Sequence, residues 1–430
     1  MLEVILNAFR LPDLRRKLLF TFAMLVVFRF IAHVPLPLSA ESYAALQNFF
    51  EDNQLLGMLN LFSGNAMRNF SVAAMGVYPY ITASIVMQLL IPIIPSLERL
   101  SKEGEAGRNK LNQYTHILTV PMAALQAYGQ LAILKNAGVL PSFGLSGPDL
   151  LPTLTMVISM TAGTVFLVWI GELITEHGIG NGVSLIIFGG IVAGLPQLLG
   201  AGTSGGLSFI ALISFAALGI AIVFAIVIFQ EAHRRIPVQY AKRIRGTRMY
   251  GGQSTHIPLR VNSAGMIPLI FAISIMLFPG TIATYFRGSS NDWVANVANF
   301  VESLFSPTAP FYWTMYFVLV VAFTFFYAMI IFQQQNLAEN LQKYGGFVPG
   351  IRPGRPTAEY LNKVLLRITV AGAVFLGLVA VAPFLIQRFT NVQALQISST
   401  GLLIVVGVVL DTVKQLEAQL LMRRYEGFIK

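Results

Sequence analysis

The sequence predicts an all-α, polytopic membrane protein with ten transmembrane helices. First, 55% of its 430 residues are hydrophobic and 11% are charged, with a mean hydropathy of +0.68, whereas soluble domains carry about 25% charged residues. Second, ten apolar runs approach the ~20 residues that a helix needs to cross a bilayer. Third, the basic residues collect in alternate connecting segments, which is typical of multi-pass membrane proteins.

The ten apolar runs are separated by polar or turn-forming segments. They are approximately Leu18–Leu36, Ala74–Ile94, Thr115–Leu134, Leu151–Ile170, Val183–Leu199, Phe209–Phe229, Ala264–Tyr285, Trp313–Gln333, Ile368–Ile386 and Ile397–Leu410. The last run is the shortest, and we expect its helix to continue into the polar tail. Because ten is an even number, both termini are expected on one side of the membrane.

The distribution of Lys and Arg orients these spans. With the N-terminus inside, 24 of the 29 basic residues lie in the inner segments. Only Arg68, Lys135, Arg287 and Arg388 lie in the outer ones, and Arg29 lies within the first run. By the positive-inside rule this asymmetry predicts cytoplasmic termini in a cell membrane.

The ten spans divide into two sets of five, one before and one after about residue 200. Equal halves of five spans have opposite orientations, which is the topology of inverted repeats with a pathway at their interface. We therefore predict an N-terminal half over residues 1–200 and a C-terminal half over residues 201–430, the latter with cytosolic loops at about 230–263 and 334–367.

A short apolar segment precedes the second span. Gly57–Met67 has about half the length of a span, and the apolar stretch Tyr78–Pro95 follows it closely. This pattern predicts a re-entrant segment that enters from the outer face. Such backbone persists at membrane depth only where protein or a water-filled cavity surrounds it. We therefore expect the other spans to form a vestibule around it.

Most catalytic chemistries lack candidates in this sequence. There is no cysteine, which excludes thiolate catalysis and disulfides, and the five histidines are scattered without the spacing of a zinc site. Gly178–Ser184 reads as a tight turn between spans rather than a phosphate loop, because no βαβ unit surrounds it. Glu172 and Glu176 could serve acid–base chemistry, but a solvated helix end is favoured.

Two alternative functions remain open from the residues alone. A secondary transporter of a small solute would fit ten inverted spans, although the span centres lack the Asp or Glu that ion coupling commonly uses. A membrane-embedded enzyme would need a nucleophile with a base, and Ser84 and Ser184 have no evident partner. Arg29 lies ~18 Å into the first span; it either faces protein or water, or snorkels outward.

Two further patterns each have a functional and a plain interpretation. Ile81 and Ile85 share one helical face, which suits an apolar constriction that closes by dewetting or ordinary packing. The loops Gln230–Ser263 and Gln334–Arg367 are basic, and connections between helices usually have only 2–8 residues. A docking surface is therefore favoured over a purely topological signal.

Long motifs in order give the chain a resemblance to the SecY family, the central subunit of the bacterial preprotein-conducting channel. They are MLNLFSGNAMRNFSVAAMGVYPYITASIVMQLL, ITEHGIGNGVSLIIFGGIVAGLP, RRIPVQYAKR, QSTHIPLRVNSAGMIPLIFA, FVPGIRPGRPTAEYL and LLIVVGVVLDT. The resemblance covers essentially the whole chain. It implies two five-helix halves that form a clamshell around an hourglass pore.

The resemblance also implies roles for particular residues. A hydrophobic pore ring falls on Ile81, Ile85, Ile187, Ile270 and Ile404. A plug spans about residues 57–69 and includes Gly57, Leu59, Leu61, Phe62, Ser63, Gly64 and Met67. A lateral gate lies between spans two and three and spans seven and eight, with a polar cluster at Thr82, Gln126 and Asn262. A docking surface includes Arg234, Arg235, Lys242, Arg243, Arg245, Arg248, Arg352 and Arg355.

The expected function is therefore that of a passive channel for unfolded secretory polypeptides across the bacterial plasma membrane, with hydrophobic segments released sideways into lipid. The implied partners are the membrane subunits SecE and SecG, the SecA ATPase, the ribosome, signal peptides, nascent chains and anionic lipids. No cofactor, metal or enzymatic activity is expected, and the small-solute transporter is the alternative.

Overall fold

A computed structural model describes the chain from residue 9 to residue 426. The residues outside the description are 10, 39–41, 44, 47–59, 61–62, 65, 137, 141–142, 145–146, 205–208, 241–242, 246–247, 251–253, 287–290, 307–308, 336 and 391–393. The chain divides into two compact units. Unit 1 consists of residues 1–217, 273–313 and 383–430, and unit 2 of residues 218–272 and 314–382. The division into an N-terminal half, 1–200, and a C-terminal half, 201–430, remains a prediction.

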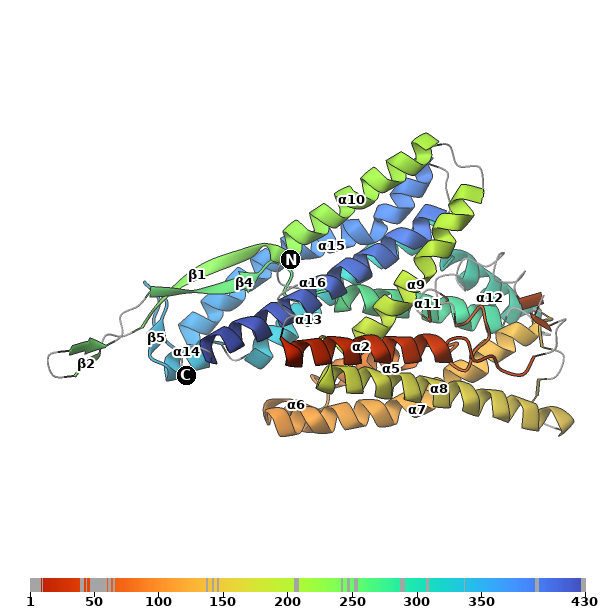
Figure 1. Cartoon of the computed structure of the whole chain (residues 1–430), viewed down its shortest axis with the longest axis horizontal. Helices are drawn as coiled ribbons and strands as arrows, with labels where there is room; N and C mark the ends of the chain where they lie inside the picture. The colour runs from red at the N-terminus through yellow and green to blue at the C-terminus, as the bar shows by residue number, and fades with distance from the viewer. Residues whose placement is uncertain are drawn as a thin grey trace. The chain divides into compact units, whose positions relative to one another are not determined.

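Helices dominate the described residues. In chain order they are α2 (Pro12–Ile31), α5 (Tyr78–Leu90), α6 (Pro95–Lys102), α7 (Glu105–Asn136), the short 3₁₀ helix η1 (Gly147–Asp149), α8 (Leu150–His177), α9 (Gly182–Ser204), α10 (Phe209–Glu231), α11 (Ile267–Phe286), α12 (Asp292–Leu304), α13 (Pro310–Gln335), α14 (Leu337–Lys343), α15 (Arg355–Thr390) and α16 (Ala394–Glu426) (Figure 1).

Each of the ten predicted spans coincides with one of these helices. By length and composition alone, four described helical stretches could each cross a membrane, Glu105–Lys135, Gly147–His177, Pro310–Lys343 and Arg355–Ala382. A fifth is added if α5 and α6 count as one span. The other spans are described over shorter or more charged helices; α2, for example, begins with Asp13, Arg15 and Arg16. As expected, α16 continues from the last apolar run into the polar tail.

The second predicted span is shorter than its apolar run. The run covers Ala74–Ile94, but α5 ends at Leu90 and α6 follows at an angle of 99°. Pro92 contributes to the break because it has no amide hydrogen to donate to the Gln88 carbonyl. Ile94 is then extended, as a residue before proline usually is, and Pro95 occupies the first turn of α6 as proline often does. On α6 the Lys102 ammonium lies 2.7 Å from the Glu98 carboxylate and lowers the pKa of that exposed group.

In unit 1, α8 packs against α7, α9 and α2, and α5 packs against α7 (Figure 1). Part of the apolar core lies among α7, α8 and the chain before α5, where Leu131, Met160 and Phe70 are almost fully buried. A second contact joins α9 to α16. At Gly401 of α16, a Cβ would lie only 3.0 Å from Ile191 of α9. Small residues therefore permit the close approach of these helices.

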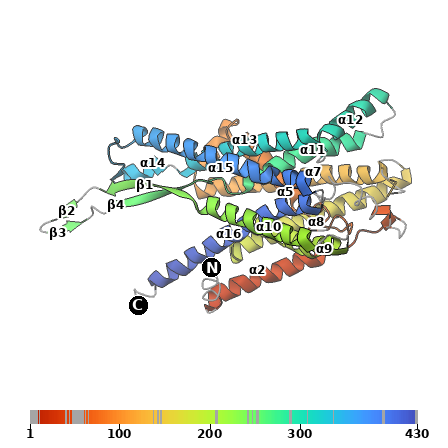
Figure 2. The same cartoon turned by 90° about the horizontal axis from the view of Figure 1, so that it is seen from above.

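Unit 2 contains a small sheet built from both basic loops. Strand β1 (His233–Tyr240) lies between β4 (Ser254–Arg260) and β5 (Gly346–Phe347), and both pairings are antiparallel. Ile236 and Val238 alternate with exposed residues and pack on Leu259, Leu341 and Leu361. Strands β2 (Arg243–Arg245) and β3 (Arg248–Tyr250) form a separate hairpin beyond this sheet (Figure 2). No strand was predicted in these loops, although buried and exposed residues alternate along β1.

Candidate functional site

The described part of the re-entrant segment includes a turn at Ser63 and Gly64, which local hydrogen bonds hold. The Ser63 hydroxyl donates to the Asn60 carbonyl at 3.0 Å and accepts from the Met67 amide at 3.1 Å. The Arg68 amide donates to Asn60 Oδ1 at 2.9 Å. Met67 is buried in the core of unit 1. The Asn60 carbonyl and the Met67 and Arg68 amides thus find side-chain partners nearby, which backbone at membrane depth requires. Gly57, Leu59, Leu61 and Phe62 lie outside the described residues.

Arg29 of α2 holds this turn. Its Nη1 atom donates to the Gly64 carbonyl at 2.6 Å, which is short for a charge-assisted hydrogen bond. Gly64 has a φ of +67°, and a Cβ added there would lie 2.7 Å from the Cα atom of Gly190 on α9. Of the two alternatives for Arg29, the structure supports the one in which the guanidinium faces protein.

The end of the segment is joined to the chain that follows α2. The Leu36 amide donates to the Phe70 carbonyl at 2.8 Å, and the Val72 amide donates to the Val34 carbonyl at 3.0 Å. Between these bonds Phe70 has a φ of +44°, a left-handed conformation that is rare for a bulky side chain. Such backbone strain persists only where the surroundings impose it. The residues after the turn are therefore held firmly.

Four of the five isoleucines assigned to a pore ring lie in unit 1 and are buried. Ile81 and Ile85 lie on α5, Ile187 on α9 and Ile404 on α16. Because α9 packs against α16, the helices that carry Ile187 and Ile404 are neighbours. Ile270 is half-buried on α11 and belongs to unit 2. The structure does not test whether the five side chains form a ring.

Two of the three polar residues assigned to the gate are in contact. Gln126 Nε2 of α7 donates to the Thr82 hydroxyl of α5 at 3.3 Å, and that hydroxyl donates to the Tyr78 carbonyl at 3.0 Å. Asn262 lies in unit 2, where its side chain donates to the Gly265 carbonyl at 2.9 Å. The amide oxygens of Gln126 and Asn262 are buried without a hydrogen-bond partner.

A cavity of about 460 Å³ opens beside this contact in unit 1. Its lining is mostly apolar and is formed by α5, α7, α11 and the chain before α5. Methionine, isoleucine and aromatic side chains contribute: Met67, Met75, Tyr78, Met122, Tyr128, Phe278, Ile282 and Phe286. Gln126 and Gln130 also line it, and the amide oxygen of each is buried without a partner. The Tyr78 hydroxyl donates to the Ser274 carbonyl of α11 at 3.0 Å. Sequence reasoning missed this bond and this cavity, although methionine is typical of adaptable apolar sites.

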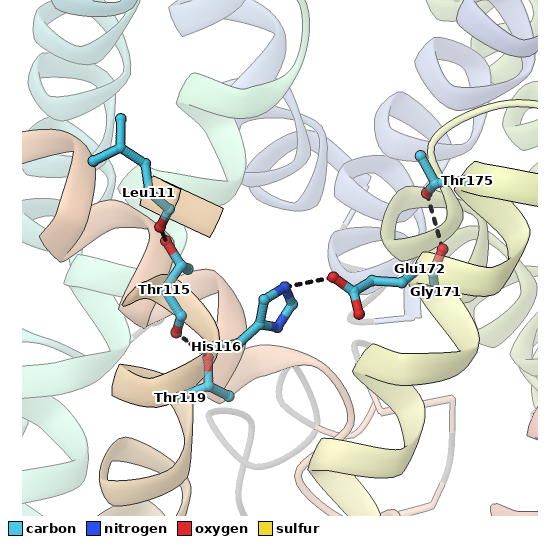
Figure 3. Close-up of polar contacts among 7 residues, drawn as sticks. All are labelled: Leu111, Thr115, His116, Thr119, Gly171, Glu172 and Thr175. Carbon is cyan, nitrogen blue, oxygen red and sulfur yellow. Dashed lines mark hydrogen bonds and ion pairs between the residues drawn. The ribbon is translucent and has the colours of Figure 1, made fainter. Parts of the chain in front are cut away.

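Glu172 takes part in a contact between helices rather than lying free at a helix end. His116 Nε2 of α7 lies 2.5 Å from Glu172 Oε1 of α8 (Figure 3). The imidazole also stacks on Tyr80 of α5 with a centroid distance of 5.5 Å. Glu176 lies 3.8 Å from the adjacent His177 and is exposed. These contacts join α5, α7 and α8, and they provide no nucleophile for an enzyme.

The glycine-rich stretch after α8 forms the tight turn that the sequence predicts. The Gly182 amide donates to the Thr175 hydroxyl at 2.9 Å, and the Ile179 amide donates to the Thr21 hydroxyl at 3.2 Å. A Cβ on Gly182 would overlap the Gly171 carbonyl oxygen. Only glycine fits there, so the motif serves packing between α8 and α9.

Exposed basic side chains lie on the small sheet and in the loop before α15. Arg234 and Arg235 are exposed on β1, Arg352 is exposed in the loop, and Arg355 lies 3.0 Å from Glu359. Arg243, Arg245 and Arg248 belong to the β2–β3 hairpin by their backbone. Lys242 lies outside the described residues.

Known proteins with a similar chain define the class. Over 94% of this chain and 92% of the other, the fold matches that of a SecY protein at a TM-score of 0.64 and 19% identity. The description of that structure states that the plug domain of the SecY protein stabilises the closed state of the translocation channel and maintains a membrane seal. Sec61 in the canine ribosome–channel complex matches at a TM-score of 0.61 and 17% identity, over 94% and 92% of the two chains. The fold is thus that of protein-conducting channels.

Sequence similarity identifies the family. The family model described as SecY matches residues 71–413. The protein translocase subunit SecY of Streptomyces galbus is 47% identical over 444 residues, covering 100% of both chains. This chain belongs to the SecY family. It is a multi-pass channel subunit of a protein translocase and not an enzyme, and the small-solute transporter is not supported.

Proposed function

We propose that the re-entrant segment closes a pore for unfolded polypeptides in the resting chain. The observation that carries this proposal is the charge-assisted bond from Arg29 to the Gly64 carbonyl, which ties the re-entrant segment to a membrane-spanning helix. The isoleucines at 81, 85, 187, 270 and 404 surround the passing chain above this plug. Apolar side chains suit that role because they seal around any sequence without hydrogen-bonding to it.

The contact between Thr82 and Gln126 belongs to a lateral gate, together with Asn262. Hydrophobic segments of the substrate leave through this gate into lipid, driven by the transfer of apolar area at ~25 cal/mol per Å². The neighbouring apolar cavity supports this assignment, because it offers an adaptable methionine-rich surface next to a weak 3.3 Å hydrogen bond. A weak bond can be broken at little cost when a substrate arrives.

External partners supply the energy for transport. Exposed arginines on β1 and at position 352 form the docking surface for SecA or the ribosome, and the hairpin arginines extend it. SecE and SecG complete the complex in the bacterial plasma membrane, where anionic lipids surround it. The excess of Lys and Arg in alternate loops supports a cytoplasmic location of both termini and of these strands.

The Arg29→Met variant tests the closing role of the re-entrant segment. Loss of the bond to Gly64 should release the segment and raise the ion conductance of the resting channel in proteoliposomes. Arg29→Lys keeps a cation and should leak less. Arg16→Met removes an exposed cation from the same helix and should not leak. Equal conductance of Arg29→Met and wild type would contradict the proposal.

A further inference from the structure

Helix α12 is a short amphipathic helix between two helices that enter the membrane. It covers Asp292–Leu304, after α11 and before α13. The Asn291 side chain accepts from the Trp293 amide at 3.2 Å and so caps the helix. At its other end Phe305 meets Phe311 of α13 edge to face, with a centroid distance of 5.9 Å. The helix is therefore a defined element with a cap at its start and a ring contact just after its end.

The side chains of α12 point in three directions. Ala298 is buried. Next to it lies an exposed apolar face in which Trp293, Val297 and Phe300 are 73%, 43% and 64% exposed. Asn296 and Asn299 are exposed on the polar side of the helix. Exposed apolar side chains that cluster on one face of a surface helix normally contact another apolar phase.

A groove of about 390 Å³ lies between α12 and α11. Only apolar residues line it: Phe278, Pro279, Ile282, Ala283 and Phe286 of α11, and Trp293, Val294, Val297, Ala298 and Val301 of α12. On α11, Phe278, Ile282 and Phe286 are exposed and recur every four residues. The exposed face of α12 thus continues along a helix that runs into the hydrocarbon layer.

The chemistry of α12 determines which partner fits this face. The helix sequence contains Asp292 and Glu302 but neither Lys nor Arg, so it does not attract anionic headgroups. Tryptophan is enriched where hydrocarbon meets water. We propose that α12 lies in the membrane–water interface with its Trp293 face among phospholipid acyl chains, and that one acyl chain occupies the groove against α11. This inference goes beyond the proposed plug and gate and does not depend on them.

The natural absence of cysteine allows single-cysteine variants to test the proposal. Val297→Cys places a fluorescent bimane label on the apolar face, and Asn299→Cys places the same label on the polar face as a matched control. The whole chain is reconstituted into phosphatidylcholine vesicles. The label is then exposed to lipid carrying a doxyl quencher at carbon 5 or carbon 16, or to iodide in the buffer.

The label at position 297 should be quenched about twofold more by the carbon 5 lipid than by the carbon 16 lipid, because interfacial helices insert ~5–10 Å. Iodide should quench it little and should quench the label at position 299 strongly. Strong quenching of both labels by iodide would place α12 in water and overturn the proposal. A label at position 297 shielded from all three quenchers would show a protein partner or a second copy on this face, which also overturns it.

Discussion

The contacts around Gly64 are tightly constrained. Its left-handed φ of +67°, its distance to Gly190 and its bond from Arg29 leave no room for a larger residue. An L-residue in this conformation costs ~1–2 kcal/mol before any clash. The segment is therefore held by a few atoms, and small changes to them should have large effects on closure.

Gly64→Ala should loosen the re-entrant segment and raise the resting ion conductance, because the new methyl group meets the backbone of α9. Gly138→Ala is the matched control, since Gly138 has a φ of +74° with nothing within 4 Å of its Cβ position. Both variants carry backbone strain, so a leak in both, or in neither, would argue against a specific role of Gly64.

Thr82 and Gln126 should respond unequally to substitution. Thr82→Val leaves the Gln126 amide nitrogen without its partner and should lower the free energy of unfolding by ~0.5–1 kcal/mol, because the bond is long and Gln126 is only partly buried. Gln126→Leu also removes an amide oxygen that is already unpaired, so stability should be unchanged or should rise by ~1 kcal/mol. Thermal unfolding in detergent measures both, with Thr82→Ser as the control. Equal losses in the two variants would contradict this account of the pair.

For single residues, the sequence predicts the type of environment better than the contact partner. An arginine inside an apolar run indicates a special environment, but the Gly64 carbonyl could not be foreseen because it depends on how α2 meets the turn at Ser63 and Gly64. The hydroxyl bond from Tyr78 to Ser274 joins residues 196 positions apart, and no local pattern encodes such a pairing. The His116–Glu172 contact is missed for the same reason.

Among the elements, the basic loops contain more structure than their composition suggests. Glycine, proline and positive charge indicate turns, yet β1 and β4 pair over seven residues. The period-two spacing of Ile236, Val238 and Tyr240 favours a strand, although Pro237 within the run counts against one. Strand β5 comes from the second basic loop, so one sheet positions arginines from both loops.

Arg352→Glu should impair motor-driven secretion while the chain still assembles, because a reversed charge at a docking surface introduces repulsion. Arg352 is exposed, so stability should be little affected. Secretion by vesicles with equal amounts of the channel measures the effect, and Arg352→Lys should retain most activity. Normal secretion by Arg352→Glu would count against docking at this loop.

For the whole molecule, hydropathy and charge were sufficient to predict the fold class. Transmembrane helices need long apolar runs that water-soluble folds do not show, so each run marks a helix even where its exact ends differ. Breaks such as the one after Leu90 depend on prolines that also occur inside other helices, including Pro121 in α7. The bend of 99° was therefore not predictable from Pro92 alone.

The orientation is a prediction of the whole charge pattern. Ser101→Cys, in an inner segment, should react with a membrane-impermeant maleimide only in inverted vesicles, and Asn296→Cys, in an outer one, only in intact cells. Both positions are polar and exposed or half-buried in the structure, so access from the aqueous side is the only variable. The reverse labelling would invert the topology and place the docking arginines outside.

The most direct measurement is crosslinking from a stalled secretory polypeptide to single cysteines in this cysteine-free chain. Ile81→Cys and Ile187→Cys test the proposed ring, and Phe22→Cys, at an exposed position of α2, is the lipid-facing control. If the polypeptide passes through the proposed ring, crosslinks form at positions 81 and 187 and none forms at position 22. Crosslinks only at position 22 would contradict passage of the polypeptide through this pore.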